Sequence, residues 1–153
     1  MIILYMSVVF GCVYLGVMAS KKLQERQSFF EDMRDFLSGY LTNISFLQNE
    51  FKMVVNDYVR FKPEADFSRF LLSYIEGVIS PPDFLTAKEQ SEVVTILKSL
   101  GKQDEESERK VVESSLNLIK VRVDMATIRT QKYSSFSVKL GLLVGVLLVI
   151  LLL

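Results

Sequence analysis

Charged residues are confined to the middle of this 153-residue chain. The ends, 1–19 and 140–153, contain no Asp, Glu, Lys or Arg. A charge within the hydrocarbon core of a bilayer is costly, and a helix satisfies its own backbone polar groups there, so a long uncharged apolar run is typical of a spanning helix. The sequence therefore predicts a soluble domain attached to a membrane at both ends.

The N-terminal run, 1–19, has the length of a full span, because roughly 19 residues at ~1.5 Å each reach about 28 Å. A cleaved signal peptide is the alternative, but it requires basic residues before the apolar run. The first basic residues, Lys21 and Lys22, come after it. The order favours a retained anchor.

The C-terminal run is shorter, about 14 residues or ~21 Å from Leu140. Extending it back to Phe136, with Lys139 reaching toward the interface, predicts a second, short span over 136–153. A core helix or an interfacial helix is the alternative. The closing segment LLVGVLLVILLL has no polar face, which favours lipid.

Basic residues flank both apolar runs on the side of the middle domain, which predicts that this domain is cytoplasmic and that both termini lie outside. The residues that would set this topology are Lys21, Lys22, Arg26, Arg129, Lys132 and Lys139.

Composition limits the chemistry of the middle domain, 20–135. The 18 basic and 18 acidic residues of the chain, all of them between Ser20 and Lys139, balance, so no basic footprint indicates nucleic-acid binding. The chain has no histidine and a single cysteine, Cys12, which removes the usual general base, the usual zinc ligands and any Ser-His or Cys-His dyad. No glycine-rich phosphate loop is present. We expect no enzyme activity and no cofactor or metal.

The pattern of the middle domain is helical, and no alternating run indicates a strand. One apolar stripe at spacings of three and four runs from Phe30 to Phe61, with a possible break at Gly39 or Asn43 and an end at Pro63. It comprises Phe30, Met33, Leu37, Tyr40, Ile44, Leu47, Phe51, Val54, Tyr58 and Phe61. The prediction is an all-α antiparallel bundle between two membrane helices.

Local signals place three further helices. Asp66 is expected to cap one that ends near Gly77, and Thr86 with Glu89 has the capping-box spacing of another that Gly101 stops. The last helix begins near Asp104 and has no Pro or Gly to interrupt it before the C-terminal apolar run. One continuous helix into that run is expected.

Two features are candidates for partner contacts. The small residues Gly141 and Gly145, with Gly11 and Gly16 in the first run, have spacings that let membrane helices approach closely. The acidic run Asp104, Glu105, Glu106 and Glu108 suits the positive end of a helix dipole, but it also offers an acidic corner on which a basic face of a partner can dock.

The order of these parts resembles the stage III sporulation protein AB family of endospore-forming Firmicutes. The residues that carry the resemblance are the N-terminal run, Arg26, Phe30, Met33, Leu37, Leu100-Gly101, Asp104, Val112, Leu116, Ile119, Lys139-Leu140-Gly141, Gly145 and the closing leucine-rich segment. Where such proteins commonly carry Gln after the Leu-Gly and Asp, this chain has Glu108.

The resemblance implies a bundle similar to the cytoplasmic domain of the platform protein of type II secretion and type IV pilus machines, with as many as six helices. It implies membership of a complex in the mother-cell membrane around the forespore. The implied partners are the lipid bilayer, a cytoplasmic secretion-type ATPase similar to stage III sporulation protein AA, and other membrane proteins of the complex. Self-association of this chain is left open.

The sequence features also fit functional classes other than a non-enzymatic platform or scaffold subunit of a secretion-like complex. A generic membrane-anchored adaptor of another pathway fits the same features. A small pore-forming, holin-like protein would have a brief loop in place of the middle domain. In a membrane-bound hydrolase, carboxylates such as Glu92 or Asp124 could act as general acid or base. The sequence contains no nucleophile motif, which makes this class the weaker alternative.

Overall fold

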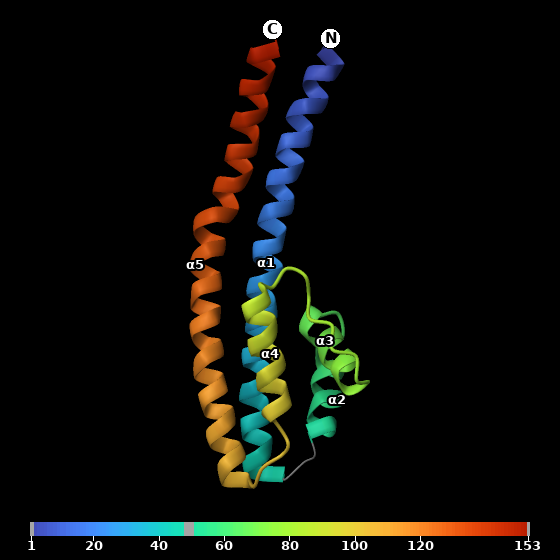
Figure 1. Ribbon diagram of the computed structural model, residues 1–153, viewed down its shortest axis with the longest axis vertical. Coiled ribbons are helices and arrows are strands. Elements are labelled where there is room, and N and C mark those ends of the chain that lie inside the picture. Colours follow the sequence, from blue (N-terminus) through green and yellow to red (C-terminus); the bar gives the residue numbers. More distant parts are fainter. Residues whose placement is uncertain (1, 48–50, 153) are drawn as a thin grey trace. The chain divides into compact units, whose positions relative to one another are not determined.

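The computed structural model describes residues 2–47 and 51–152, all of them within helices or the turns that join helices. The helices are α1 (Ile2–Leu47), α2 (Phe51–Phe61), α3 (Asp66–Ile75), α4 (Ala87–Ser99) and α5 (Glu105–Leu152). Figure 1 shows their order along the chain. The all-α class predicted from periodicity is confirmed, since no strand occurs within these two described ranges.

The chain divides into two compact units. One, the paired arms, comprises residues 1–27 and 125–153, and the other, the bundle, comprises residues 28–124. The helices α1 and α5 each contribute to both units. The domain boundaries expected from charge, 1–19, 20–135 and 136–153, stay predictions.

In the paired arms, the first part of α1 and the last part of α5 run antiparallel, and both chain termini lie at the same end of the unit (Figure 1). The Thr130 hydroxyl on α5 donates a 3.2 Å hydrogen bond to the Leu23 carbonyl on α1. Within residues 2–47 and 51–152, none of the helices combines the length and apolarity that crossing a membrane requires. The spanning helices expected at 1–19 and 136–153 therefore have no support from the structure.

Phenylalanine rings form the centre of the bundle. Phe36 on α1 and Phe67 on α3 are 1% and 0% exposed, with ring centroids 5.7 Å apart. Phe29, about two turns earlier on α1, meets Phe67 edge-to-face at 5.3 Å and Phe84 at 5.9 Å. Edge-to-face packing is a favoured geometry for aromatic rings. These contacts join α1 to α3 and to the segment before α4.

The predicted apolar stripe from Phe30 to Phe61 is divided between α1 and α2, but the division is not where the sequence suggested. The break expected at Gly39 or Asn43 is wrong, because α1 continues through both to Leu47. Neither residue needs a break: apart from adjacent residues and the backbone of its own helix, no described atom lies within 4 Å of the position of a Cβ on Gly39, and the Asn43 amide donates a 3.0 Å hydrogen bond to the Gly39 carbonyl. The residues between Leu47 and Phe51 lie outside the described ranges.

The second half of the stripe is α2, which ends at Phe61, as Pro63 predicted. Val54 and Val55 are buried, but Phe61 is 81% exposed, so its assignment to the buried stripe is wrong. A helix keeps one face toward its neighbours, and the last residue of α2 has no layer beyond it to pack on. The hydroxyl of Tyr58 donates a 2.8 Å hydrogen bond to the Asp32 carbonyl, which joins α2 to α1.

The start of α3 differs by one residue from the prediction. The N-cap is Ala65, whose side chain makes no capping hydrogen bond, and Asp66 is the first helical residue. Its carboxylate accepts a 3.2 Å hydrogen bond from Arg69 one turn later. An acidic residue in the first turn is favoured by the helix dipole whether or not it caps. The end near Gly77 is confirmed, with φ of +85° at this glycine.

Local signals located α4 and α5 accurately. The capping box is confirmed: the Glu89 N–H donates to Thr86 Oγ1 at 3.4 Å, and the Thr86 N–H donates to Glu89 Oε2 at 3.0 Å. Gly101, at φ +73°, follows the end of α4. The continuous last helix is also confirmed, and its stripe of Val112, Leu116, Ile119 and Val123 is buried.

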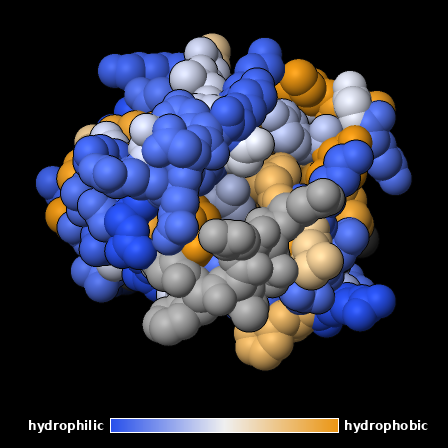
Figure 2. All heavy atoms as spheres, turned by 90° about the horizontal axis from the view of Figure 1, so that it is seen from below, coloured by the Kyte–Doolittle hydropathy of each residue, from blue (hydrophilic) through white to orange (hydrophobic). Residues whose placement is uncertain are grey.

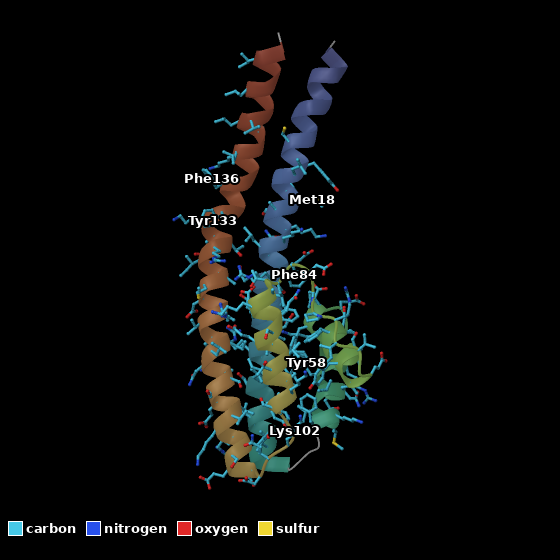
Figure 3. The ribbon with its side chains drawn as sticks, viewed as in Figure 1. Met18, Tyr58, Phe84, Lys102, Tyr133 and Phe136 are labelled. Carbon is cyan, nitrogen blue, oxygen red and sulfur yellow. The ribbon has the colours of Figure 1, made fainter. Side chains whose placement is uncertain are left out.

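Seen from the end at which α5 begins, the surface is mostly hydrophilic, with hydrophobic residues in separate patches (Figure 2). This end of the bundle carries the turn between α4 and α5, where Lys102 is marked in Figure 3.

Candidate interaction surfaces

The acidic residues at the start of α5 divide into exposed and buried members. Asp104 precedes the helix, and its Oδ2 accepts a 3.2 Å hydrogen bond from the Ser107 N–H. Hydrogen bonds from Ser107 lower the pKa of the Asp104 carboxyl. Glu105 and Glu106 are exposed, and Glu106 makes a 2.7 Å ion pair with Lys110. Asp104, Glu105 and Glu106 form an exposed group, hereafter the acidic corner.

Glu108 does not belong to that exposed corner, which corrects its grouping with the other three residues. It is 4% exposed, and its Oε1 accepts hydrogen bonds from the Tyr40 hydroxyl at 3.1 Å and from the Gly101 N–H at 2.6 Å. The reason is the helical period: Glu108 lies four residues before the buried Val112, on the face of α5 that packs inward. Its carboxylate joins α1, α5 and the turn before α5.

The Tyr40–Glu108 contact has an electrostatic consequence. Burial, together with the negative charge of Glu108 and the hydrogen bond to it, raises the pKa of the Tyr40 hydroxyl. The second carboxylate oxygen, Oε2, is buried and has no hydrogen-bond partner among the described residues. A buried carboxylate with one bonded oxygen is costly to maintain, so the two donors to Oε1 matter for the fold.

The residues expected to set topology lie in the paired arms and differ in environment. Lys21 makes a 3.6 Å ion pair with Glu25, Lys22 is exposed, and Arg26 is 8% exposed. On α5, Arg129 and Lys139 are exposed, and the Lys132 ammonium lies 5.5 Å from the Tyr133 ring centroid. Their role in orientation stays a prediction.

The apolar surface of the paired arms is partly exposed. Met18 on α1 and Tyr133 and Phe136 on α5 are labelled in Figure 3 and are 44%, 46% and 55% exposed.

The small residues expected at helix contacts are only partly described. Gly16 is buried, and Gly11 is exposed with no atom within 4 Å of the position its Cβ would take. The surroundings of Gly141 and Gly145 lie outside what the structure describes. The packing role of all four stays a prediction.

The two carboxylates expected to be candidates for acid–base chemistry, Glu92 and Asp124, have different environments. Both oxygens of Glu92 accept 2.6 Å hydrogen bonds from the Arg122 guanidinium, which joins α4 to α5, whereas Asp124 is exposed. Among the residues that the structure describes, no group of three or more His, Cys, Asp and Glu side chains could hold a metal ion.

Three lysines gather around a hollow that the sequence did not reveal. Two adjoining hollows, of about 300 and 520 Å³, share Phe51, Lys52 and Tyr74 in their lining. Lys98 lines the smaller hollow and Lys102 the larger one. We call this surface the lysine groove. Its complete lining is Phe51, Lys52, Tyr74, Ile75, Gly77, Ile79, Leu97, Lys98, Leu100, Gly101 and Lys102. No spacing signal links Lys52 to Lys98 and Lys102, because only the fold brings the start of α2 to the end of α4.

The architecture and surfaces define the class first: an all-helical bundle whose first and last helices continue into a second unit. The family model described as stage III sporulation protein AB matches residues 80–153, which include α4, α5 and the acidic corner. Residues 80–153 are therefore similar to that family, and the resemblance seen in the sequence is confirmed over this part of the chain. No curated protein and no solved structure matches the chain.

Proposed function

We propose that this protein is a non-enzymatic platform subunit of a secretion-like membrane complex required for endospore formation. The observation that carries the proposal is the match of residues 80–153 to a family of stage III sporulation proteins. The helical bundle is suited to such a role. Side-chain contacts between segments distant in sequence, such as Tyr40 with Glu108, hold its helices together, so the bundle can keep partners in place. In this proposal the protein works by position.

Membrane attachment is the second element of the proposal. It is supported by the sequence alone, in which 1–19 and 140–153 carry no charge and basic residues follow or precede these runs. The bundle would then face the mother-cell cytoplasm with both termini outside, in the membrane around the forespore. The small residues Gly11, Gly16, Gly141 and Gly145 would pack against other membrane helices of the complex.

The third element is a cytoplasmic secretion-type ATPase docked on the acidic corner. Glu105 is exposed and makes no ion pair with any described residue, and the Glu106–Lys110 pair is fully at the surface, where such pairs contribute little and exchange readily. Both carboxylates are therefore available to a basic face of a partner. The complex would couple the ATPase to membrane proteins through the bundle.

Deletion of the gene in its own host tests the sporulation role. Cells lacking the protein should grow normally but lose heat-resistant spores, and the wild-type gene supplied elsewhere on the chromosome should restore them. An unchanged count of heat-resistant spores would reject the proposed function.

Co-purification tests the docking element separately. The double variant E105K/E106K should no longer retain the ATPase encoded in the same host, whereas E113K, an exposed reversal two turns further along α5, should retain it. Equal retention by both variants would remove the acidic corner from the proposal. Alkaline extraction of membranes tests attachment, since a spanning protein stays in the pellet and a peripheral one is released.

A further inference from the structure

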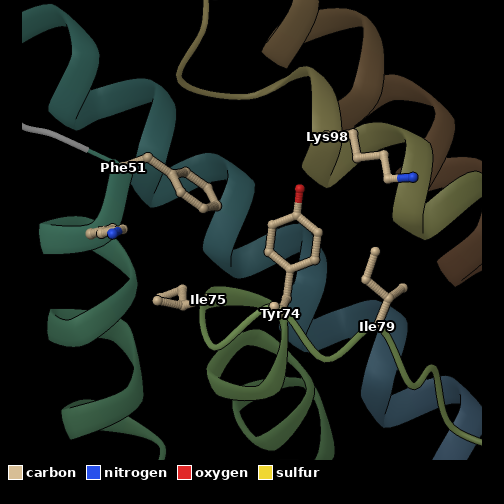
Figure 4. A pocket seen from close by; sticks show the side chains of 7 residues that line it. Phe51, Tyr74, Ile75, Ile79 and Lys98 are labelled. Carbon is tan, nitrogen blue, oxygen red and sulfur yellow. The ribbon is translucent and has the colours of Figure 1, made fainter.

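The lysine groove is open, and its floor is apolar. Leu97 and Leu100 at its base are 1% and 4% exposed, whereas Ile79 on the rim is 47% exposed. Figure 4 shows the ring of Tyr74 between Phe51 and the pair Lys98 and Ile79, with these side chains coming from α2, α3, α4 and the segment after α3. A ligand in the groove would thus meet hydrophobic side chains below and ammonium groups at the sides.

The charge of the groove has one sign. Its lining contains three lysines and no acidic residue. None of the three makes an ion pair with a described residue, in contrast to Lys62, which pairs with Asp32 at 2.7 Å and Asp35 at 3.1 Å. Neighbouring like charges repel one another, and an anionic partner would relieve that repulsion.

Helix dipoles account for only part of this arrangement. Lys98, in the last turn of α4, is favourably placed at the negative end of that helix. Lys52 lies in the first turn of α2, where the dipole disfavours a cation. Helix stability therefore does not explain why Lys52 faces the same hollow as Lys98 and Lys102.

From this geometry we propose that the lysine groove binds an acidic amphipathic helix of a partner protein, with apolar side chains on the floor and carboxylates at the three lysines. Recognition of an amphipathic helix in an apolar groove is a common binding mode. An extended peptide would gain its affinity from a sheet edge, and the described part of this chain has no strand. A small ligand would be enclosed on most sides, whereas this groove has three exposed side chains around it.

A membrane surface is the competing macromolecule. Binding to a flat anionic bilayer favours protruding apolar side chains among lysines, whereas Leu97 and Leu100 lie buried at the bottom of the groove and only Ile79 of the apolar lining is strongly exposed among the described residues. The concave shape favours a helix. The inference does not rest on the sporulation role or on the acidic corner, since it concerns the lysines of α2, α4 and the turn before α5.

A fluorescent peptide tests the inference directly. The chain has no tryptophan, so the emission of a single tryptophan on a synthetic helical peptide reports only on the peptide. The probe has leucines on one face with glutamates on both sides, and a matched probe has glutamine for every glutamate. The full chain, in nanodiscs of zwitterionic lipid, should bind the glutamate peptide saturably, and the glutamine peptide roughly tenfold more weakly.

Variants locate the binding. K98E and K102E should each weaken the glutamate peptide roughly tenfold, and Ile79→Ser should weaken both peptides. K88E is the matched control, because Lys88 is exposed on α4 but does not line the groove. Since all these residues are exposed, an unchanged far-UV circular dichroism spectrum should confirm the fold.

Several results would overturn the proposal. These are no binding of the glutamate peptide, equal binding of the two peptides, or equal loss in K98E and K88E. Lysine-dependent binding of phosphatidylglycerol vesicles without peptide binding would assign the groove to a membrane instead. None of these outcomes bears on the spore counts that test the proposed function.

Discussion

The hydroxyl of Tyr40 donates a 3.1 Å hydrogen bond to Oε1 of Glu108, a residue 68 positions away in the sequence. The same oxygen accepts from the Gly101 N–H at 2.6 Å, so one carboxylate oxygen holds α1, α5 and the turn before α5 together. The Tyr40 side is nearly closed to water, with 3% of the residue exposed.

Removal of this carboxylate should destabilise the bundle. In Glu108→Ala the Tyr40 hydroxyl and the Gly101 N–H lose their acceptor, which costs about 1–3 kcal/mol for buried groups. Glu108→Gln keeps one acceptor oxygen and removes a buried charge, so we expect a smaller cost. Urea unfolding followed by circular dichroism measures both, with the exposed Glu105→Ala as control. Equal midpoints for the Glu108→Ala and Glu105→Ala variants would contradict the structural role.

The two glycines Gly101 and Gly39 should respond in opposite directions to alanine. Gly101 has φ of +73°, and a Cβ there would lie 3.0 Å from the Phe51 Cβ, so Gly101→Ala should cost about 1–2 kcal/mol from the backbone alone. Gly39 is in the middle of α1 with free space at its Cβ position, so Gly39→Ala should stabilise by roughly 0.5–1 kcal/mol. Thermal midpoints compare the two, and shifts of the same sign would be inconsistent with the structure.

The capping box should stabilise α4 measurably. Thr86→Ala removes the acceptor of the Glu89 N–H and should cost about 1 kcal/mol. Thr95→Ala is the control: its hydroxyl donates to the Ser91 carbonyl within the same helix, and alanine is the better helix former, so little change or a slight gain is expected. A cost at Thr95 that matches the cost at Thr86 would show that the cap contributes nothing specific.

The acid side of the stability profile should depend on Asp35. Burial by itself raises the pKa of its carboxyl, but hydrogen bonds and charges from Arg34 and Lys62 outweigh burial, so the pKa is lowered. A carboxyl with a lowered folded-state pKa stabilises the fold above its unfolded pKa of 3.8, and this contribution is lost as pH falls through the folded pKa. The difference in unfolding free energy between wild type and Lys62→Gln should therefore shrink below about pH 4.

The alkaline side follows from Lys62. Hydrogen bonds to Asp32 raise its pKa above 10.5, so its contribution is present below that pH and is lost as pH rises through the raised value. The control Lys88→Gln, an exposed lysine on another helix, should show the same difference from wild type at every pH. A Lys62→Gln difference that is flat from pH 3 to 7 would contradict the proposed linkage.

Structural features that depend on short segments of the chain could be predicted from the sequence. The all-α class follows from apolar spacings of three and four, and the Thr86–Glu89 box, Gly77, Gly101 and the start near Asp104 each depend on neighbours within a few residues. The family was also readable, because its residues in 80–153 lie in order along the chain. The break at Gly39 or Asn43 was wrong because glycine and asparagine are compatible with a helix as well as with a turn, and α1 continues through both.

The sequence by itself determined the all-α class, the capping box of α4, the helix ends near Gly77 and Gly101, and the similarity of residues 80–153 to a family. Only the tertiary structure separated buried Glu108 from exposed Glu105 and brought Lys52 beside Lys98 and Lys102. The physical reason is range. Helix periodicity and capping act over about one turn, whereas burial and charge clustering depend on contacts between segments that are distant along the chain.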